Sequence, residues 1–203
     1  MLVGNRGGTF MKANKLVLAA VLTLVGAIPA MANEHQLATI REATAKYKDV
    51  KAALADGFIP DPSGQCVSAA AEGMPAEMGA MGIHYLNPAR LGITATAPRV
   101  TGTGLNVDFN APSVLLYEPQ ADGSLVLAGV EDLVFITAWE AAGNSAPPKF
   151  GDQVWEKMAD MADTAADEAH GFEPHYDLHV WTERANPSGP FVSFNPAVTC
   201  PKG

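Results

Sequence analysis

The fold is decided by residues 114–136, which read VLLYEPQADGSLVLAGVEDLVFI. Two apolar runs flank Asp122-Gly123, and Asp-Gly between such runs predicts the turn of an antiparallel β-hairpin. The second run is apolar on both faces, which is typical of a central strand covered on both sides. Side chains alternate along a strand, so Glu131 and Asp132 fall in opposite rows, and Gly129 marks a candidate β-bulge. The row of Glu131 is otherwise apolar: Leu125, Leu127, Leu133 and Phe135.

Two helices are predicted beside this hairpin. The first covers Asn33 to Asp56, where apolar residues recur at helical spacing until Gly57 ends the pattern. The second covers Asp152 to His170, and its apolar face consists of Val154, Met158, Met161 and Ala165. Without β–α–β alternation, these elements predict an α+β fold, an antiparallel sheet built around a long hairpin and packed with two main helices. His170 is expected to cap the C-terminal end of the second helix, where its side chain interacts favourably with the helix dipole.

A further strand is predicted at Tyr176 to Arg184, inside the stretch FEPHYDLHVW of residues 172–181. Alternation places His175, Asp177 and His179 on one face of this strand, with Tyr176 on the other. No other stretch has so many side chains that can hold a metal ion or a proton. It is therefore the candidate functional site.

The two histidines of this strand need ligands from elsewhere to hold a metal. On a strand they lie about 13 Å apart, so they share an ion only through local twist or a bulge. His84 is available, and Glu131 is a carboxylate in an apolar row that needs a partner. We therefore predict a metal site of His84, Glu131, His175 and His179. Three neighbours are predicted to support it: Asp177, Tyr176 and Glu118.

The identity of the metal depends on the methionines that precede His84. Met74, Met78 and Met81 would share one face with His84 if the segment were helical. We interpret them as core filler. If they were ligands, copper would be favoured, whereas histidine and carboxylate alone favour zinc. The chain has no phosphate-binding or dinucleotide-binding motif, so no nucleotide cofactor is expected.

Other interpretations of the same residues stay open. Glu131 can belong to a structural network, paired with Arg90, Arg99 or Arg184. The site can be a metal-free pocket for a small molecule. It can also be that of a small hydrolase or lyase in which His179 acts as base and Asp177 orients it. The sequence decides neither whether the chain is an enzyme nor its oligomeric state.

Residues 1–32 have the pattern of a cleaved signal peptide. Lys12 and Lys15 precede an apolar run at residues 16–28, and Ala30-Met31-Ala32 is a small-x-small cleavage site. Met11 is the expected start, and the run is too short to span a bilayer. No cysteine lies directly after the apolar run, so a lipid-anchored protein is not expected. We predict export to the periplasm or the extracellular space, with residues 33–203 as a single globular domain.

Charge and cysteine content agree with export. Loss of Arg6, Lys12 and Lys15 with the leader leaves 10 basic against 22 acidic residues, a net charge of −12. Such a surface argues against nucleic acid and anionic membranes as partners. The two cysteines, Cys66 and Cys200, are predicted to form a structural disulfide, as is usual outside the cytosol.

Four segments carry a resemblance to other proteins: MGIHY at 81–85, LLYEP at 115–119, PHYDLHVW at 174–181, and Asn195-Pro196 followed by Cys200. In these segments the chain resembles a group of exported bacterial proteins of unassigned function. The resemblance spans most of residues 33–203 and implies no activity.

Overall fold

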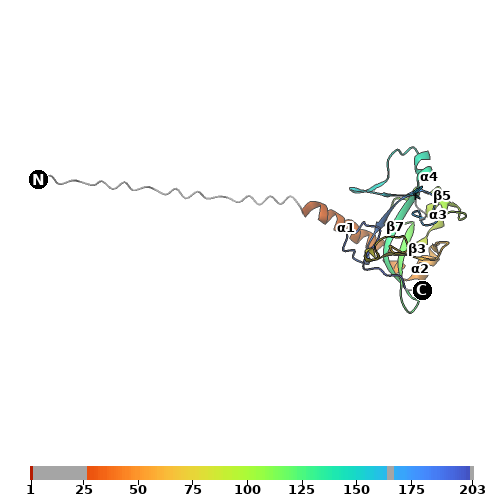
Figure 1. Ribbon diagram of the computed structural model, residues 1–203, viewed down its shortest axis with the longest axis horizontal. Coiled ribbons are helices and arrows are strands. Elements are labelled where there is room, and N and C mark those ends of the chain that lie inside the picture. Colours follow the sequence, from red (N-terminus) through yellow and green to blue (C-terminus); the bar gives the residue numbers. More distant parts are fainter. Residues whose placement is uncertain (2–26, 164–166, 202–203) are drawn as a thin grey trace.

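The computed structural model describes residue 1, residues 27–163 and residues 167–201 (Figure 1). Within these residues the main feature is a seven-stranded sheet with the neighbour order β1-β3-β6-β7-β11-β10, in which β2 also pairs with β3. Every pairing in this sheet is antiparallel. An antiparallel sheet with a few helices confirms the α+β class. The strands are β1 (Ile59–Pro60), β2 (Cys66–Ser68), β3 (Ala80–Leu86), β6 (Val114–Pro119), β7 (Leu125–Phe135), β10 (Glu156–Met158) and β11 (His175–Val180).

A hairpin of β6 and β7 forms the centre of the sheet. Its turn contains Asp122-Gly123, and Gly123 adopts the left-handed conformation with φ +82°. β7 is the longest strand and pairs with β6 on one side and β11 on the other. The position of a residue along β7 therefore determines which residues of β6 and β11 lie beside it in the sheet.

A β-bulge in β7 changes which side chains share a face. Leu116 pairs with Gly129 and Tyr117 with Leu127, so Ala128 is the extra residue. Leu127 packs in the same apolar cluster as Val130 and Val134, whereas Leu133 and Phe135 pack in another. The predicted row of Glu131 is therefore correct for Leu133 and Phe135 and wrong for Leu125 and Leu127, because the extra residue reverses the alternation.

Each face of the sheet has its own apolar cluster. One face packs against the N-terminal helices, where Leu37, Ile40 and Tyr47 meet Leu115 and Val130. The other face is covered by the short helix α3 (Pro88–Leu91), loops and the C-terminal segment, which contribute Leu91, Phe172, Trp181 and Val198. In Figure 1, α1 leads into the body of the sheet. The central strand β7 is thus covered on both faces.

The predicted helix over residues 33–56 is helical but divided. It consists of α1 (Ala27–Thr44), the 3₁₀ helix η1 (Ala45–Lys48) and α2 (Val50–Ala55). The break lies at Asp49, whose side chain accepts a hydrogen bond from the Lys51 N–H and caps α2. Most of the predicted leader, residues 1–32, lies outside the described residues. No helix of the described part is long and apolar enough to cross a membrane.

The predicted helix over residues 152–170 is wrong. The described residues there form β9 (Gln153–Val154), which pairs with β8 (Lys149–Phe150), and the edge strand β10, and then continue without a helix. Trp155 is 2% exposed, whereas Val154 and Met161 of the predicted apolar stripe are 52% and 55% exposed. Pairing of β10 with β11 supplies the backbone hydrogen bonds that a helix would otherwise supply.

The remaining elements are short: η2 (Ala76–Met78), α3 (Pro88–Leu91), β4 (Ile93–Ala95), β5 (Thr101–Gly102) and α4 (Ile136–Ala141). Met74, Met78 and Met81 do not share a helix, because Met81 lies in β3. All three pack with Ala69 and Phe194 as apolar filler.

The predicted disulfide is present. Cys66 of β2 is bonded to Cys200 with a Cα–Cα distance of 5.7 Å, which links the sheet to the C-terminal tail.

Candidate metal centre

Three strands bring His84, Glu131 and His179 to one face of the sheet. Glu131 of β7 is directly opposite His179 of β11. His84 lies on β3, two strands from β7, and its partner Leu116 on β6 is paired in turn with Gly129. Gly129 and Glu131 are neighbours on this face, so the His84 side chain reaches Glu131 diagonally across β6.

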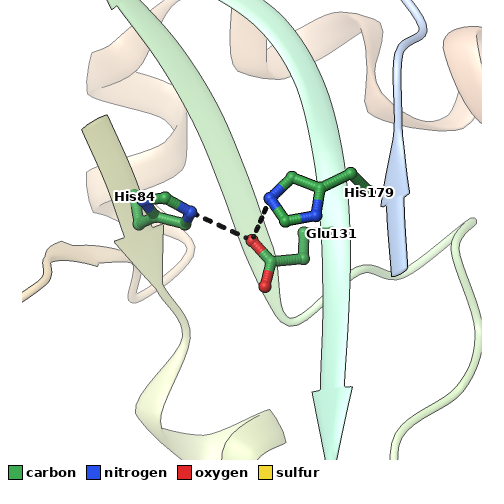
Figure 2. A group of neighbouring side chains, drawn as sticks. All are labelled: His84, Glu131 and His179. Atoms are coloured by element: carbon green, nitrogen blue, oxygen red, sulfur yellow. Dashed lines mark ion pairs between the residues drawn. The ribbon is translucent and has the colours of Figure 1, made fainter. Parts of the chain in front are cut away.

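The distances from Glu131 to the two histidines match those between ligands in one coordination sphere. Figure 2 shows both imidazoles turned toward the same carboxylate oxygen. Glu131 Oε2 lies 3.3 Å from His84 Nε2 and 3.5 Å from His179 Nε2, and the three donor atoms all lie within 4.8 Å of one another. Ligands bound to zinc at about 2.1 Å in tetrahedral geometry lie about 3.3–3.5 Å apart. The group can therefore hold a metal ion.

Two of these three side chains, Glu131 and His179, have atoms without the hydrogen-bond partners that buried polar groups normally have. His84, Glu131 and His179 are 8%, 2% and 2% exposed. Glu131 Oε2 and both ring nitrogens of His179 have no hydrogen-bond partner among the described residues. A buried carboxylate or imidazole without partners costs free energy, so an unsatisfied cluster of this kind needs an explanation. A bound cation would satisfy Glu131 Oε2 and His179 Nε2.

The electrostatics favour the protonation states of ligands at two of the three positions. Burial opposes ionisation of Glu131, but His179, His84 and His175 outweigh it and lower its pKa to about 2. Burial lowers the pKa of His179 to about 4, against the attraction of Glu131. For His84, burial is outweighed by contact with Glu131, which raises its pKa. At neutral pH Glu131 is therefore anionic and His179 neutral, as metal binding requires.

His175, predicted as a ligand, lies outside this group. It pairs with Phe135, four residues along β11 from His179, so the strand keeps it away from Glu131. Its Nδ1 is 2.9 Å from the Glu173 carbonyl oxygen. Because a carbonyl only accepts, Nδ1 carries the proton, and neutral His175 has an unprotonated Nε2.

Of the three predicted supporting residues, only Asp177 lies next to the group. Its Oδ2 is 3.8 Å from His179 Nδ1, and burial raises the pKa of Asp177 well above its usual value. Tyr176 points to the opposite face of β11 and packs against the apolar cluster there. Glu118 binds Arg184 and accepts hydrogen bonds from Thr199. Tyr176 and Glu118 therefore do not support the site.

The arginines considered as partners of Glu131 bind elsewhere. Arg90 donates to the Pro112 carbonyl, Arg99 to the Phe172 carbonyl, and Arg184 to Glu118. Imidazoles, and not guanidinium groups, therefore surround the Glu131 carboxylate.

A cavity of about 470 Å³ opens beside the three ligands. His175, Asp177, Asp61 and Glu72 line it together with them. His170 also lines it and was missed, because the sequence pattern placed it at the end of a helix. In the structure His170 has φ +52°, its Nδ1 is 3.4 Å from Glu72 Oε2, and burial lowers its pKa. Its position five residues before His175 is the signal that relates it to the site.

Comparison with family models, curated proteins and solved structures finds no match to this chain. The resemblance to exported bacterial proteins stays a prediction, and the site rests on its own geometry.

Two nitrogens and one carboxylate, with an adjoining cavity, form the donor pattern of zinc sites that keep a coordination position open. A metal at such a site can bind or polarise a small ligand. The metal-free alternative, with His179 as base, is less well supported. His179 Nδ1 is too far from Asp177 for a hydrogen bond, and a pKa of about 4 makes His179 a weak base at neutral pH.

Proposed function

We propose that this chain is an exported protein that binds one divalent transition metal ion, zinc in the first place, through His84, Glu131 and His179. Its role is to bind or handle the metal. One observation carries the proposal: Glu131 Oε2 is buried within 3.5 Å of two imidazole nitrogens, one from His84 on β3 and one from His179 on β11. The cavity leaves room for a further ligand on the ion.

The donor set favours zinc over copper(I). The three ligand atoms are nitrogen and oxygen, which suit zinc, whereas copper(I) is selected by thioethers and thiolates. The methionines near His84 are packed with Phe194 in an apolar cluster. Export is supported by the disulfide, which is typical of oxidising compartments, and by the predicted leader.

Metal analysis and zinc titration test the proposal. Protein isolated without chelator is expected to contain about one zinc per chain. After chelation, zinc should bind again with a stoichiometry of one, measured by competition with a chromophoric chelator.

A pair of carboxylate variants identifies the site. Glu131→Gln keeps the shape of the side chain and removes its charge, so zinc affinity should fall at least about 100-fold, as expected when a ligand and not merely its support is lost. The matched control is Glu118→Gln, a buried carboxylate held by Arg184. It should bind zinc as the unchanged protein does. Equal losses in both variants, or no zinc binding at all, would refute the proposal.

A further inference from the structure

A second cavity, the methionine groove, lies next to the metal cavity and shares Glu72, Met81 and His170 with it. Its volume is about 610 Å³. Five of the eight methionines of the chain line it: Met74, Met78, Met81, Met158 and Met161. Phe191 and Phe194 of the C-terminal segment complete the apolar wall. Segments far apart in the sequence thus form one apolar surface.

The size and lining of the groove indicate a small-molecule site. Ligand pockets occupy about 300–1,000 Å³ and are mostly apolar, with a few polar groups that orient the ligand. A metal ion needs only a small fraction of this volume. Methionine side chains are unbranched and polarisable, so a wall of thioethers adapts to flexible apolar guests. The guest is therefore expected to have an apolar body.

The charged groups of the groove restrict the charge of the ligand's head group. Three carboxylates line it, Glu72, Glu156 and Glu168, and no lysine or arginine is among its described lining residues. Glu156 accepts a hydrogen bond from Ser193 at 2.7 Å, and Glu72 faces His170. An anionic head group, such as that of a fatty acid, would be repelled here. A cationic head group would be attracted.

We propose that the methionine groove binds an amphipathic cation, with its apolar body on the methionines and its ammonium group beside the three glutamates. This site adjoins the metal cavity, but none of the three proposed metal ligands lines it. It gives a function to the methionine-rich segment at residues 74–81.

Three probes with the same octyl chain test the proposal by isothermal titration calorimetry on the whole protein at pH 7: octylammonium, octan-1-ol and octanoate. Octylammonium should bind at least tenfold more tightly than octanoate, with octan-1-ol between them, and salt should reduce the difference. Hexylammonium should bind about fourfold more weakly per methylene removed. All titrations use the metal-free protein, so failure of the metal proposal leaves this result unchanged.

A pair of lysine variants locates the binding. Met78→Lys places a cation in the groove and should weaken octylammonium binding at least tenfold. The control Val126→Lys introduces the same side chain on β7, at a position that is 38% exposed and outside the groove, and should have no effect. Circular dichroism verifies that both variants are folded.

Several results would overturn the proposal. These are no octylammonium binding, affinities that are independent of head group or chain length, and equal effects of the two lysine variants. A change of oligomeric state in Met78→Lys without octylammonium binding to the unchanged protein would instead assign the groove to contact with a second copy.

Discussion

Glu131 and Asp132 are adjacent acids, yet β7 gives them opposite environments. Glu131 faces two imidazoles, which hold its pKa at about 2 despite burial. Asp132 is fully buried on the other face, where its Oδ1 accepts hydrogen bonds from Ser113 and Asn106. Burial outweighs these bonds and raises the pKa of Asp132 to about 7. Glu131 is thus an anion at neutral pH, whereas the adjacent Asp132, whose side chain points to the opposite face of β7, titrates near neutral pH.

This difference predicts how Asp132 affects stability. Its pKa is 3.8 when exposed and about 7 in the folded chain, so between these values the folded state binds more protons. Stability of the metal-free protein should therefore fall as pH rises from about 4 to 7, by roughly 4 kcal/mol at most from this group. Asp132→Asn keeps an acceptor for Ser113 and should lose this part of the pH dependence. Urea unfolding of both proteins at pH 5 and pH 8 measures it, and parallel profiles would contradict it.

Two histidine variants distinguish ligands from neighbours at the metal centre. His179→Gln removes a nitrogen that lies 3.5 Å from Glu131 and should reduce zinc affinity at least about 100-fold. His175→Gln changes a residue outside the three-donor group and should reduce it less than about tenfold. Competitive zinc titration measures both. A loss in His175→Gln as large as that in His179→Gln would show that His175 is a fourth ligand.

At the scale of elements, the sequence predicts the features that patterns within one segment determine: strands, turns and the face on which a side chain lies. The apolar runs around Asp122-Gly123 indicate strands on either side of a turn, and alternation places His175 and His179 on one face of β11. Histidine–carboxylate chemistry also singles out His84 and Glu131. Gly129 indicates a bulge in β7, and the structure has it one residue earlier, at Ala128. The edge pairing of β10 and the position of His170 depend on contacts between distant segments. No periodicity within a single segment reveals them.

The two residues that precede the edge strand β10 offer a test of the corrected secondary structure. Trp155 is buried against Phe109, with ring centroids 5.6 Å apart, whereas the adjacent Val154 is 52% exposed. Trp155→Ala should destabilise the chain by about 3–5 kcal/mol, because it leaves a large cavity. Val154→Ala should change stability by less than about 0.5 kcal/mol. Urea denaturation of both variants decides, and a larger loss for Val154→Ala would instead support the helical pattern.

At the scale of the whole molecule, the two faces of the sheet differ in what they contact. One face packs against the N-terminal helices and forms an apolar core. The other face carries the metal cavity beside its own apolar cluster. The methionine groove adjoins this cavity, and the C-terminal segment closes the groove with Phe191 and Phe194. The groove therefore depends on how the tail is held, whereas the three proposed metal ligands lie on β3, β7 and β11 within the sheet.

The disulfide holds this tail, and its removal gives the last prediction. Cys66 and Cys200 are 134 residues apart, so the bond restricts almost the whole unfolded chain. A Cys66→Ala, Cys200→Ala double variant should lose about 2–5 kcal/mol of stability, and a reductant should lower the stability of the unchanged protein alone. Zinc affinity should stay within a few fold, because the ligands lie on β3, β7 and β11 inside the sheet. Octylammonium binding should weaken more, because Phe191 and Phe194 precede the lost link.

Urea titrations with and without reductant, followed by both binding assays, measure these effects. Unchanged stability would show that backbone pairing of Ala80 with Asn195 is enough to anchor the tail.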